Sequence, residues 1–236
     1  MIISTFRHLP WCMNAAISPS SSSPSAFQTC HTHATAASRL PRSHTLGLIG
    51  LGNIGAHLAA KLGNPAFGMR IAYFDIARKP ADVEAALGAT FHPTLAGLLG
   101  AADCVVLCAP ASPDGRPLIT AETLGYFKPG ARFVNVARGS LVDEEALADA
   151  VEQGVLGAAA LDVHGDEPRV NQRLAAMARG VEGDGPGMGR VMLTCHNAGG
   201  TVETHVGFEE LSMRNVMGVL QGKGALTPVN LGDLRR

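Results

Sequence analysis

Apolar residues follow two different patterns along most of the chain. Short apolar runs, typical of buried strands, lie at 46–49, 70–74, 103–108, 132–136, 158–163 and 191–194. Stretches with a helical spacing of apolar residues lie at 54–62, 80–87, 95–102, 121–127, 143–153 and 202–220. Strands that alternate with helices are typical of βαβ units, so we expect an α/β fold with a doubly wound parallel sheet. In such a fold, ligands bind outside the carboxyl ends of the strands.

The segment from His44 to Gly55 contains the most specific of these strand-to-helix connections. An apolar run leads directly into Gly50-x-Gly52-x-x-Gly55, and a helical stretch follows. In a dinucleotide-binding turn, the first glycine permits a tight bend, the second lets the backbone approach a pyrophosphate, and the third lets the helix pack on the sheet. The N–H groups at the start of the helix favour an anion. This order of strand, turn and helix therefore predicts a dinucleotide site.

Asp75, at the end of the next apolar run, strengthens this interpretation. A carboxylate in that place can accept hydrogen bonds from an adenosine ribose, and it would repel a 2′-phosphate. The pattern therefore favours NAD over NADP, although the cation Arg78 lies close by in the sequence. The alternative is that Asp75 is an ordinary turn residue after a strand.

Three polar residues, Arg138, Glu167 and His196, follow the last three predicted strands. We expect them to meet, because the carboxyl ends of parallel strands lie at one edge of the sheet. A guanidinium suits a substrate carboxylate, and an imidazole can exchange a proton with an oxygen whose carbon gains or loses a hydride. The Glu167 carboxylate can hydrogen-bond that imidazole and favour its charged form. Taken singly, each residue also fits an ordinary surface or turn position.

Composition excludes several other classes of function. The 236 residues are 46% apolar and 17% charged, as in globular proteins generally. A net charge of −1 and a pI near 6.7 give no broad basic surface, so we expect no nucleic-acid partner. The 5 cysteines are scattered without metal-ligand spacing, which predicts reduced thiols in a cytoplasmic protein and no metal site. We expect no membrane association, because no apolar run approaches the ~18–20 residues that span a bilayer.

Four blocks of sequence carry a resemblance to a known family. They are GLGNIG at 50–55, FKPGARFVNVARGSLVDEEAL at 127–147, GAAALDVHGDEP at 157–168 and CHNAGGT at 195–201. They resemble successive signatures of the D-isomer-specific 2-hydroxyacid dehydrogenases, and in particular the fungal branch similar to D-mandelate dehydrogenase. The resemblance covers about residues 40 to 230.

This resemblance implies an NAD-dependent interconversion of a small-molecule 2-oxo acid and a D-2-hydroxy acid, and a homodimer. It implies that Arg138 binds the substrate carboxylate, that His196 is the acid or base, and that Glu167 pairs with His196. It also implies that Asp162 faces the nicotinamide carboxamide. The cofactor-binding residues that we expect, from the glycine pattern and from the resemblance together, are Gly50, Gly52, Asn53, Ile54, Gly55, Asp75, Ala109, Pro110, Ala137, Arg138, Asp162, His196 and Gly199.

The N-terminal region departs from the family pattern. Family members carry a separate substrate domain, mostly before the cofactor domain, and we expect that domain to be largely absent here. Residues 1–44 resemble a hinge helix and arm packed on the cofactor domain, which we assign to 45–236. Residues 1–44 lack acids, as an organelle transit peptide does, but the apolar run at 1–17 lacks its Arg-rich spacing. The glycine-rich stretch at 179–190 predicts a surface excursion.

Two functions follow from this sequence. The first is the cofactor half of a dehydrogenase, with Arg138, Glu167 and His196 in place but with turnover impaired by the missing substrate domain. The alternative is a non-catalytic NAD-binding or corepressor-like interaction module, or a truncated product whose exposed hinge surface associates with a partner.

Overall fold

The computed structural model describes residues 40–111, 114–179 and 189–228. The chain divides into two units, one that ends at Cys195 and one that begins at His196. The predicted hinge helix and arm fall largely on 1–39, and most of the predicted excursion falls on 180–188, so both predictions lie outside the described residues. Within the described ranges, no helix is both long enough and apolar enough to cross a membrane.

The first unit opens with the elements around the glycine turn. In chain order they are a 3-10 turn (Pro41–Ser43), β1 (Thr45–Ile49), α3 (Asn53–Leu62), β2 (Arg70–Phe74), α4 (Ala81–Leu87), β3 (Ala89–Phe91), α5 (Leu95–Ala101) and β4 (Cys104–Leu107). The later elements are α6 (Ala121–Leu124), β5 (Ala131–Asn135), a 3-10 turn (Gly139–Leu141), α7 (Glu144–Glu152), β6 (Leu156–Leu161), α8 (Gln172–Arg179) and β7 (Val191–Leu193).

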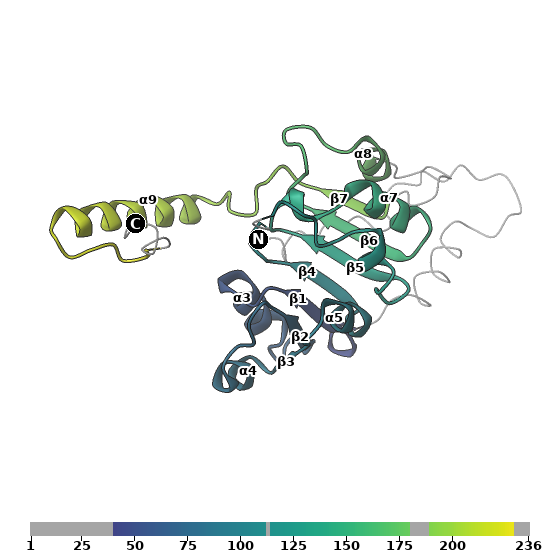
Figure 1. The fold of residues 1–236 in the computed structure, drawn as a ribbon, viewed down its shortest axis with the longest axis horizontal. Coiled ribbons are helices and arrows are strands. Elements are labelled where there is room, and N and C mark those ends of the chain that lie inside the picture. Colours follow the sequence, from purple (N-terminus) through teal and green to yellow (C-terminus); the bar gives the residue numbers. More distant parts are fainter. Residues whose placement is uncertain (1–39, 112–113, 180–188, 229–236) are drawn as a thin grey trace, which may run out of the picture. The chain divides into compact units, whose positions relative to one another are not determined.

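The strands form one 7-stranded sheet in the order β3-β2-β1-β4-β5-β6-β7, and every neighbouring pair is parallel (Figure 1). This order confirms the predicted doubly wound sheet. The chain reverses its direction of travel across the sheet at β1, because β2 and β4 lie on opposite sides of it. The crevice outside the carboxyl ends of β1 and β4 is the topological switch point, where such sheets bind ligands.

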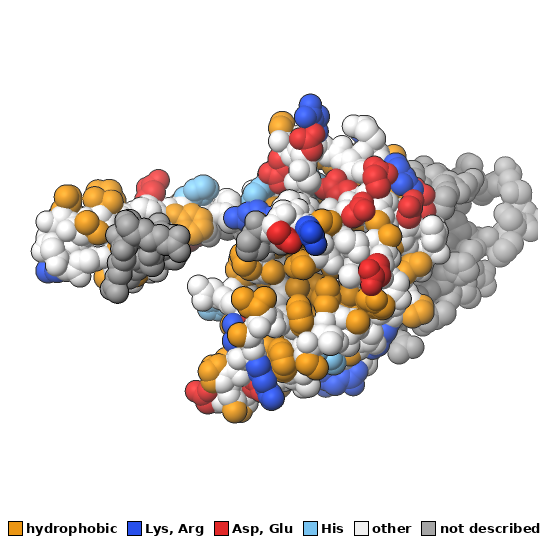
Figure 2. Space-filling model, viewed as in Figure 1, with side chains coloured by type: hydrophobic (Ala, Val, Ile, Leu, Met, Phe, Trp, Pro, Cys, Tyr) orange, Lys and Arg blue, Asp and Glu red, His pale blue; other side chains and the backbone are white. Residues whose placement is uncertain are grey.

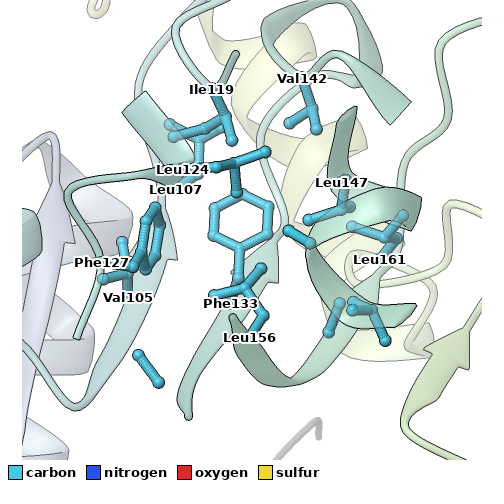
Figure 3. Packing of buried hydrophobic residues seen from close by; sticks show 14 of the residues in the cluster. Val105, Leu107, Ile119, Leu124, Phe127, Phe133, Val142, Leu147, Leu156 and Leu161 are labelled. Atoms are coloured by element: carbon cyan, nitrogen blue, oxygen red, sulfur yellow. The ribbon is translucent and has the colours of Figure 1, made fainter. Parts of the chain in front are cut away.

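Successive side chains of a strand point to opposite faces of the sheet, and here both faces are covered by buried apolar residues. In β1, Leu48 belongs to one buried cluster, together with Ala59 of α3, and Ile49 belongs to the other. The second cluster is the larger and contains residues of α5, α6, α7 and α8. Phe133 of β5 lies at its centre and Phe127 packs edge-on against it, with ring centroids 6.1 Å apart (Figure 3).

Two elements of the sheet layers escaped prediction, and some bounds differ. The strand β3 spans only Ala89–Phe91, too short to show a period, and α8 lies in a segment that the sequence analysis left unassigned. The strand β6 begins at Leu156, two residues before the predicted start. The helix α6 ends at Leu124, where Gly125 forms the cap, and not at the predicted residue 127.

The second unit contains one long helix, α9 (Val202–Leu220), which confirms the predicted range. The Thr201 side chain caps its N-terminus by accepting the N–H of Thr204, and Asn215 bonds to Thr227 in the tail that follows the helix. No residue of α9 is buried within this structure, and many of its apolar side chains are exposed (Figure 2). That residues 45–236 form a single cofactor domain stays a prediction.

Candidate active site at the carboxyl edge of the sheet

The turn after β1 has the geometry that the three glycines predict. Gly50 has a φ of +94°, which a side chain rarely adopts, and a Cβ there would lie 3.1 Å from the backbone N of Ala109. A Cβ on Gly55 would collide with the carbonyl oxygen of Gly50. At Gly52, by contrast, nothing lies within 4 Å of the position of a Cβ. The turn is therefore bent at Gly50, closed at Gly55 and open at Gly52.

The helix that starts at this turn leaves its first N–H groups available. Gly52 is the N-cap of α3 and offers no side chain to those groups, whereas Asp143 caps α7 and Thr94 caps α5 through their side-chain oxygens. Asn53 and Ile54, in the first turn of α3, are both exposed. An anion placed over Gly52 would therefore meet unpaired donors and the positive end of the helix dipole.

Asp75 follows β2 and contacts the glycine turn directly. Its Oδ2 accepts the N–H of Leu51 at 3.0 Å and pairs with Lys79 Nζ at 3.1 Å, while Oδ1 accepts the N–H of Ile76 at 2.8 Å. Burial acts to raise the pKa of Asp75, but the Leu51 N–H, Lys79 and the Ile76 N–H together hold it below its ordinary value. Asp75 is therefore a carboxylate at neutral pH, as the ribose interpretation requires.

Arg78, the cation beside Asp75 in the sequence, is held by a second carboxylate. Its Nε and Nη2 donate to the two oxygens of Glu84 at 3.0 and 2.9 Å, and its guanidinium carbon lies 5.6 Å from the ring centroid of Phe91. The Tyr73 hydroxyl donates to the same Glu84 at 2.6 Å and accepts the N–H of Lys79. Hydrogen bonds from Arg78 and Tyr73 lower the pKa of Glu84.

The turn after β5 positions Arg138 by means of a buried asparagine. The Asn135 side chain, 1% exposed, donates to the carbonyl of Arg138 at 3.0 Å and accepts the N–H of Ala137 at 3.0 Å. Ala137 is buried, while the Arg138 side chain is exposed and donates to the carbonyl of Ala137. Asn135 thus fixes the backbone from which the guanidinium extends, a role that the sequence analysis did not assign.

His164 connects the segments that follow β5, β6 and β7. Gly139 packs so closely on its carbonyl group that a Cβ there would collide with it. Glu167 Oε1 accepts the backbone N–H of His164 at 2.9 Å. The buried ring donates from Nε2 to the carbonyl of Thr194, also at 2.9 Å, because a carbonyl oxygen can only accept. Within the described part of the chain, its buried Nδ1 has no hydrogen-bond partner.

Asp162 lies beside this connection, at the end of β6. It is 6% exposed and accepts the hydroxyl of Thr194 at 2.5 Å, and its N–H donates to the carbonyl of Asn135. Its carboxylate is thus fixed at the carboxyl edge of the sheet. The role of His164 was missed, although the sequence block that contains it was recognised, because its partner Thr194 follows a different strand, 30 residues further along the chain.

The structure brings most of the predicted residues to this edge within the first unit. Gly50 lies against Ala109, which is followed by the exposed Pro110, and the segment from Ala137 to Arg138 lies one strand from Asp162. His196 and Gly199 belong to the second unit. His196 has a φ of +54°, a left-handed conformation that is uncommon for a residue with a side chain. Among the described residues, no group of three His, Cys, Asp or Glu could hold a metal ion.

Comparison with known proteins identifies the family. A model of the NAD-binding domain of D-isomer-specific 2-hydroxyacid dehydrogenases matches residues 15–198. The chain belongs to the D-isomer-specific 2-hydroxyacid dehydrogenase family. This finding confirms the resemblance seen in the four sequence blocks, and it confirms that the parallel sheet is the NAD-binding fold of that family.

Relatives in this family are known both as sequences and as structures. A glyoxylate reductase from Thermococcus onnurineus is 37% identical over 79% of this chain and 51% of its own length. The D-mandelate dehydrogenase of Rhodotorula graminis is 36% identical, with a TM-score of 0.76 over 86% of this chain and 56% of that one. An NADPH-dependent glyoxylate/hydroxypyruvate reductase from Sinorhizobium meliloti, in complex with NADP and malonate, is 34% identical, with a TM-score of 0.67 over 79% and 53%. The chain spans about half the length of the curated glyoxylate reductases that it matches.

Proposed function

We propose that this chain binds NAD(H) at the carboxyl edge of its sheet and takes part in the interconversion of 2-oxo acids and D-2-hydroxy acids, as an oxidoreductase acting on the CH–OH group of its donor. The turn after β1 carries the proposal, because it is bent at Gly50, packed at Gly55 and open at Gly52. The uncapped N-terminus of α3 and the ionised Asp75 fit the pyrophosphate and the ribose of the same ligand.

The reaction needs a group that binds the substrate carboxylate and a group that exchanges a proton with the oxygen on C2. The chemistry that NAD(H) supplies when bound is the transfer of a hydride to or from C2 of the substrate. Arg138 would bind the substrate carboxylate through its exposed guanidinium. His196 would exchange a proton with the oxygen on C2, and Glu167 would orient the imidazole and favour its charged form. The pairing of His196 with Glu167 rests on the family resemblance.

Cofactor binding can be tested without turnover. Titration of the chain into NADH, followed by the nicotinamide fluorescence, should give saturable binding. Replacement of Asp75 by Ala should weaken that binding, because it removes an acceptor for the ribose hydroxyls. An unchanged affinity in Asp75→Ala, or no binding by the native chain, would count against the proposal.

An assay of turnover tests the roles of the catalytic residues independently of cofactor binding. Glyoxylate, hydroxypyruvate and phenylglyoxylate are suitable 2-oxo acids, with NADH oxidation followed by absorbance. We expect slow turnover by the 236-residue chain alone, because closure of two domains normally excludes water and positions the substrate. The His196→Ala and Arg138→Ala variants should abolish it, whereas NADH should still bind, although less tightly, through the glycine turn and Asp75. Equal turnover by both variants and the native chain would refute these roles.

A second function is a non-catalytic NAD-binding or corepressor-like module. It is favoured by the exposed apolar side chains of α9, such as Val202 at 75% and Leu220 at 76% exposure, since large apolar surfaces usually mark interaction sites. Fusion of this chain to the substrate domain of a glyoxylate reductase relative distinguishes the two functions. Recovery of turnover in the fusion would favour the enzyme, and its continued absence would favour the module.

We also propose that the protein is a cytoplasmic homodimer. The described cysteines, Cys104, Cys108 and Cys195, are free thiols, as a reducing compartment maintains them. The homodimer rests on the family resemblance. Light scattering after gel filtration measures the mass of the particle, and a monomer at micromolar concentration would refute this part of the proposal.

A further inference from the structure

The turn that follows Asp75 contains two cationic side chains, Arg78 and Lys79, and each of them pairs with a carboxylate of this chain. Lys79 Nζ lies 3.1 Å from Asp75, and Arg78 makes two hydrogen bonds to Glu84. Relatives in this family include a reductase that is NADPH-dependent. Discrimination between the two cofactors therefore has to arise from residues that differ among members, close to the 2′ position of the adenosine ribose.

Glu84 is fixed from two directions, so it can hold Arg78 in place. Its side chain is only 11% exposed. It accepts a hydrogen bond of 2.6 Å from the hydroxyl of the fully buried Tyr73 and two hydrogen bonds from the guanidinium of Arg78. The face of Phe91 supports the guanidinium on the other side. A planar cation held by two parallel hydrogen bonds and an aromatic ring is strongly oriented.

Arg78 remains accessible to solvent even though it is held. Its side chain is 64% exposed, and it lies three residues beyond Asp75 on the same turn. An arginine near the ribose is the group that accommodates a 2′-phosphate in dinucleotide-binding folds. Freed from Glu84, its long side chain could turn toward that position. Held by Glu84, it offers a charge that is already neutralised.

We propose that Glu84 is a specificity-determining residue, which keeps Arg78 from the 2′ position of the cofactor and so makes this chain prefer NAD(H) to NADP(H). The inference deepens the proposed function and rests on it. The preference then has two sources: the Asp75 carboxylate repels a 2′-phosphate, and Glu84 withholds the cation that would offset this repulsion. Glu84 acts through Arg78 and does not itself touch the cofactor.

The test is the ratio of the dissociation constants of NADPH and NADH, measured by fluorescence titration at one ionic strength. Glu84→Gln keeps the shape of the side chain and an oxygen for Tyr73, but it removes the charge that holds Arg78. We expect this variant to bind NADPH at least about tenfold more tightly than the native chain does, and its affinity for NADH to change less than about twofold. A ratio that stays within about twofold of the native value in folded Glu84→Gln overturns the proposal.

A double variant identifies the cation responsible. Glu84→Gln combined with Arg78→Met should lose the gain in NADPH affinity, and a gain that persists would show that Arg78 is not the group released. Competition by adenosine 2′,5′-bisphosphate and by 5′-AMP should show the same contrast, because the two probes differ only in the 2′-phosphate. Equal displacement by both probes in Glu84→Gln would also overturn the proposal.

Arg78→Met alone tests whether Arg78 contacts the 2′-phosphate, and it does not depend on the folding of Glu84→Gln. With Arg78 already withheld, its loss should leave the affinity of the native chain for NADPH within about twofold. A marked loss would show that Arg78 reaches the phosphate despite Glu84. Failure of the native chain to bind NADH at all would refute the proposed function, whereas NADH binding with an unaltered preference in the variants would refute this inference alone.

Discussion

Two glycine-to-alanine substitutions in the turn after β1, three residues apart, should have different effects. In Gly52→Ala, the backbone at φ −79° and ψ −159° is an extended conformation that alanine accepts, and nothing lies within 4 Å of the new methyl group. In Gly55→Ala, the methyl group would collide with the carbonyl oxygen of Gly50, a backbone atom that cannot move without shifting the turn. The first change should therefore impair binding, and the second should impair folding.

The magnitudes follow from these surroundings. Gly52→Ala should leave stability unchanged or raise it by about 0.4–1 kcal/mol, because alanine restricts the unfolded chain. Its methyl group would occupy the side from which a pyrophosphate approaches, and loss of charge-assisted hydrogen bonds costs about 1.5–3 kcal/mol, or roughly ten- to a hundredfold in Kd. Gly55→Ala should cost about 1–3 kcal/mol of stability, as overpacking does, and lower Tm by about 2–4 °C for each kcal/mol.

The assays are NADH titration by fluorescence and thermal unfolding by circular dichroism. Gly100→Ala is the matched control, because it lies in α5 with its Cβ 3.7 Å from the nearest atom, an ordinary contact. The control should bind NADH normally and unfold at the same or a slightly higher temperature. Native affinity for NADH in Gly52→Ala, or an undiminished Tm in Gly55→Ala, would refute the account of this turn.

Three further predictions concern other parts of the first unit. Gly139→Ala should lower Tm by several degrees, because its methyl group would collide with the carbonyl group of His164. Burial acts to raise the pKa of Asp103, but a backbone N–H and Lys128 hold it below its ordinary value. The stabilisation it provides is therefore present above the unfolded pKa and lost as pH falls through the folded one, so Asp103→Asn should lower Tm at pH 7 and have a diminishing effect below about pH 4. Burial raises the pKa of Cys104, in β4, to about 11 and that of Cys108, directly after β4, to about 12, so mass spectrometry after brief alkylation at pH 8 should find the exposed Cys195 modified well before either of them.

The sequence was sufficient where local constraints decide the structure. The strand β1, the turn and α3 were predicted because a left-handed bend at Gly50 and close packing at Gly55 require glycine wherever they occur. The buried strands were recognised as continuous apolar runs, as expected for a parallel sheet covered on both faces. The helix α9 was predicted over its full range, since its length makes the helical period plain.

Elements and contacts that depend on distant residues were not predictable in this way. Arg173 ties the helix α8 to α7, because it pairs with three acids of α7, which are Glu145, Asp149 and Glu152. These partners lie more than twenty residues away in the sequence. Glu84 has nearer partners in the sequence, but it too looks like an ordinary helical acid, because Tyr73 and Arg78 precede its helix and contact it only in the folded chain.

The candidate site consequently has two halves with different physical origins. The cofactor turn is fixed by close backbone packing at Gly50 and Gly55 and by the hydrogen bond from the Leu51 N–H to Asp75. The segments after β5, β6 and β7 are instead held to one another by hydrogen bonds and close packing around the backbone and ring of His164. The two halves lie on different strands of one sheet, and the contacts that fix the glycine turn are different from those that hold the segments around His164. Binding of NADH and the proposed acid–base chemistry should therefore be separable, so that NADH should bind to the glycine turn even where turnover is slow.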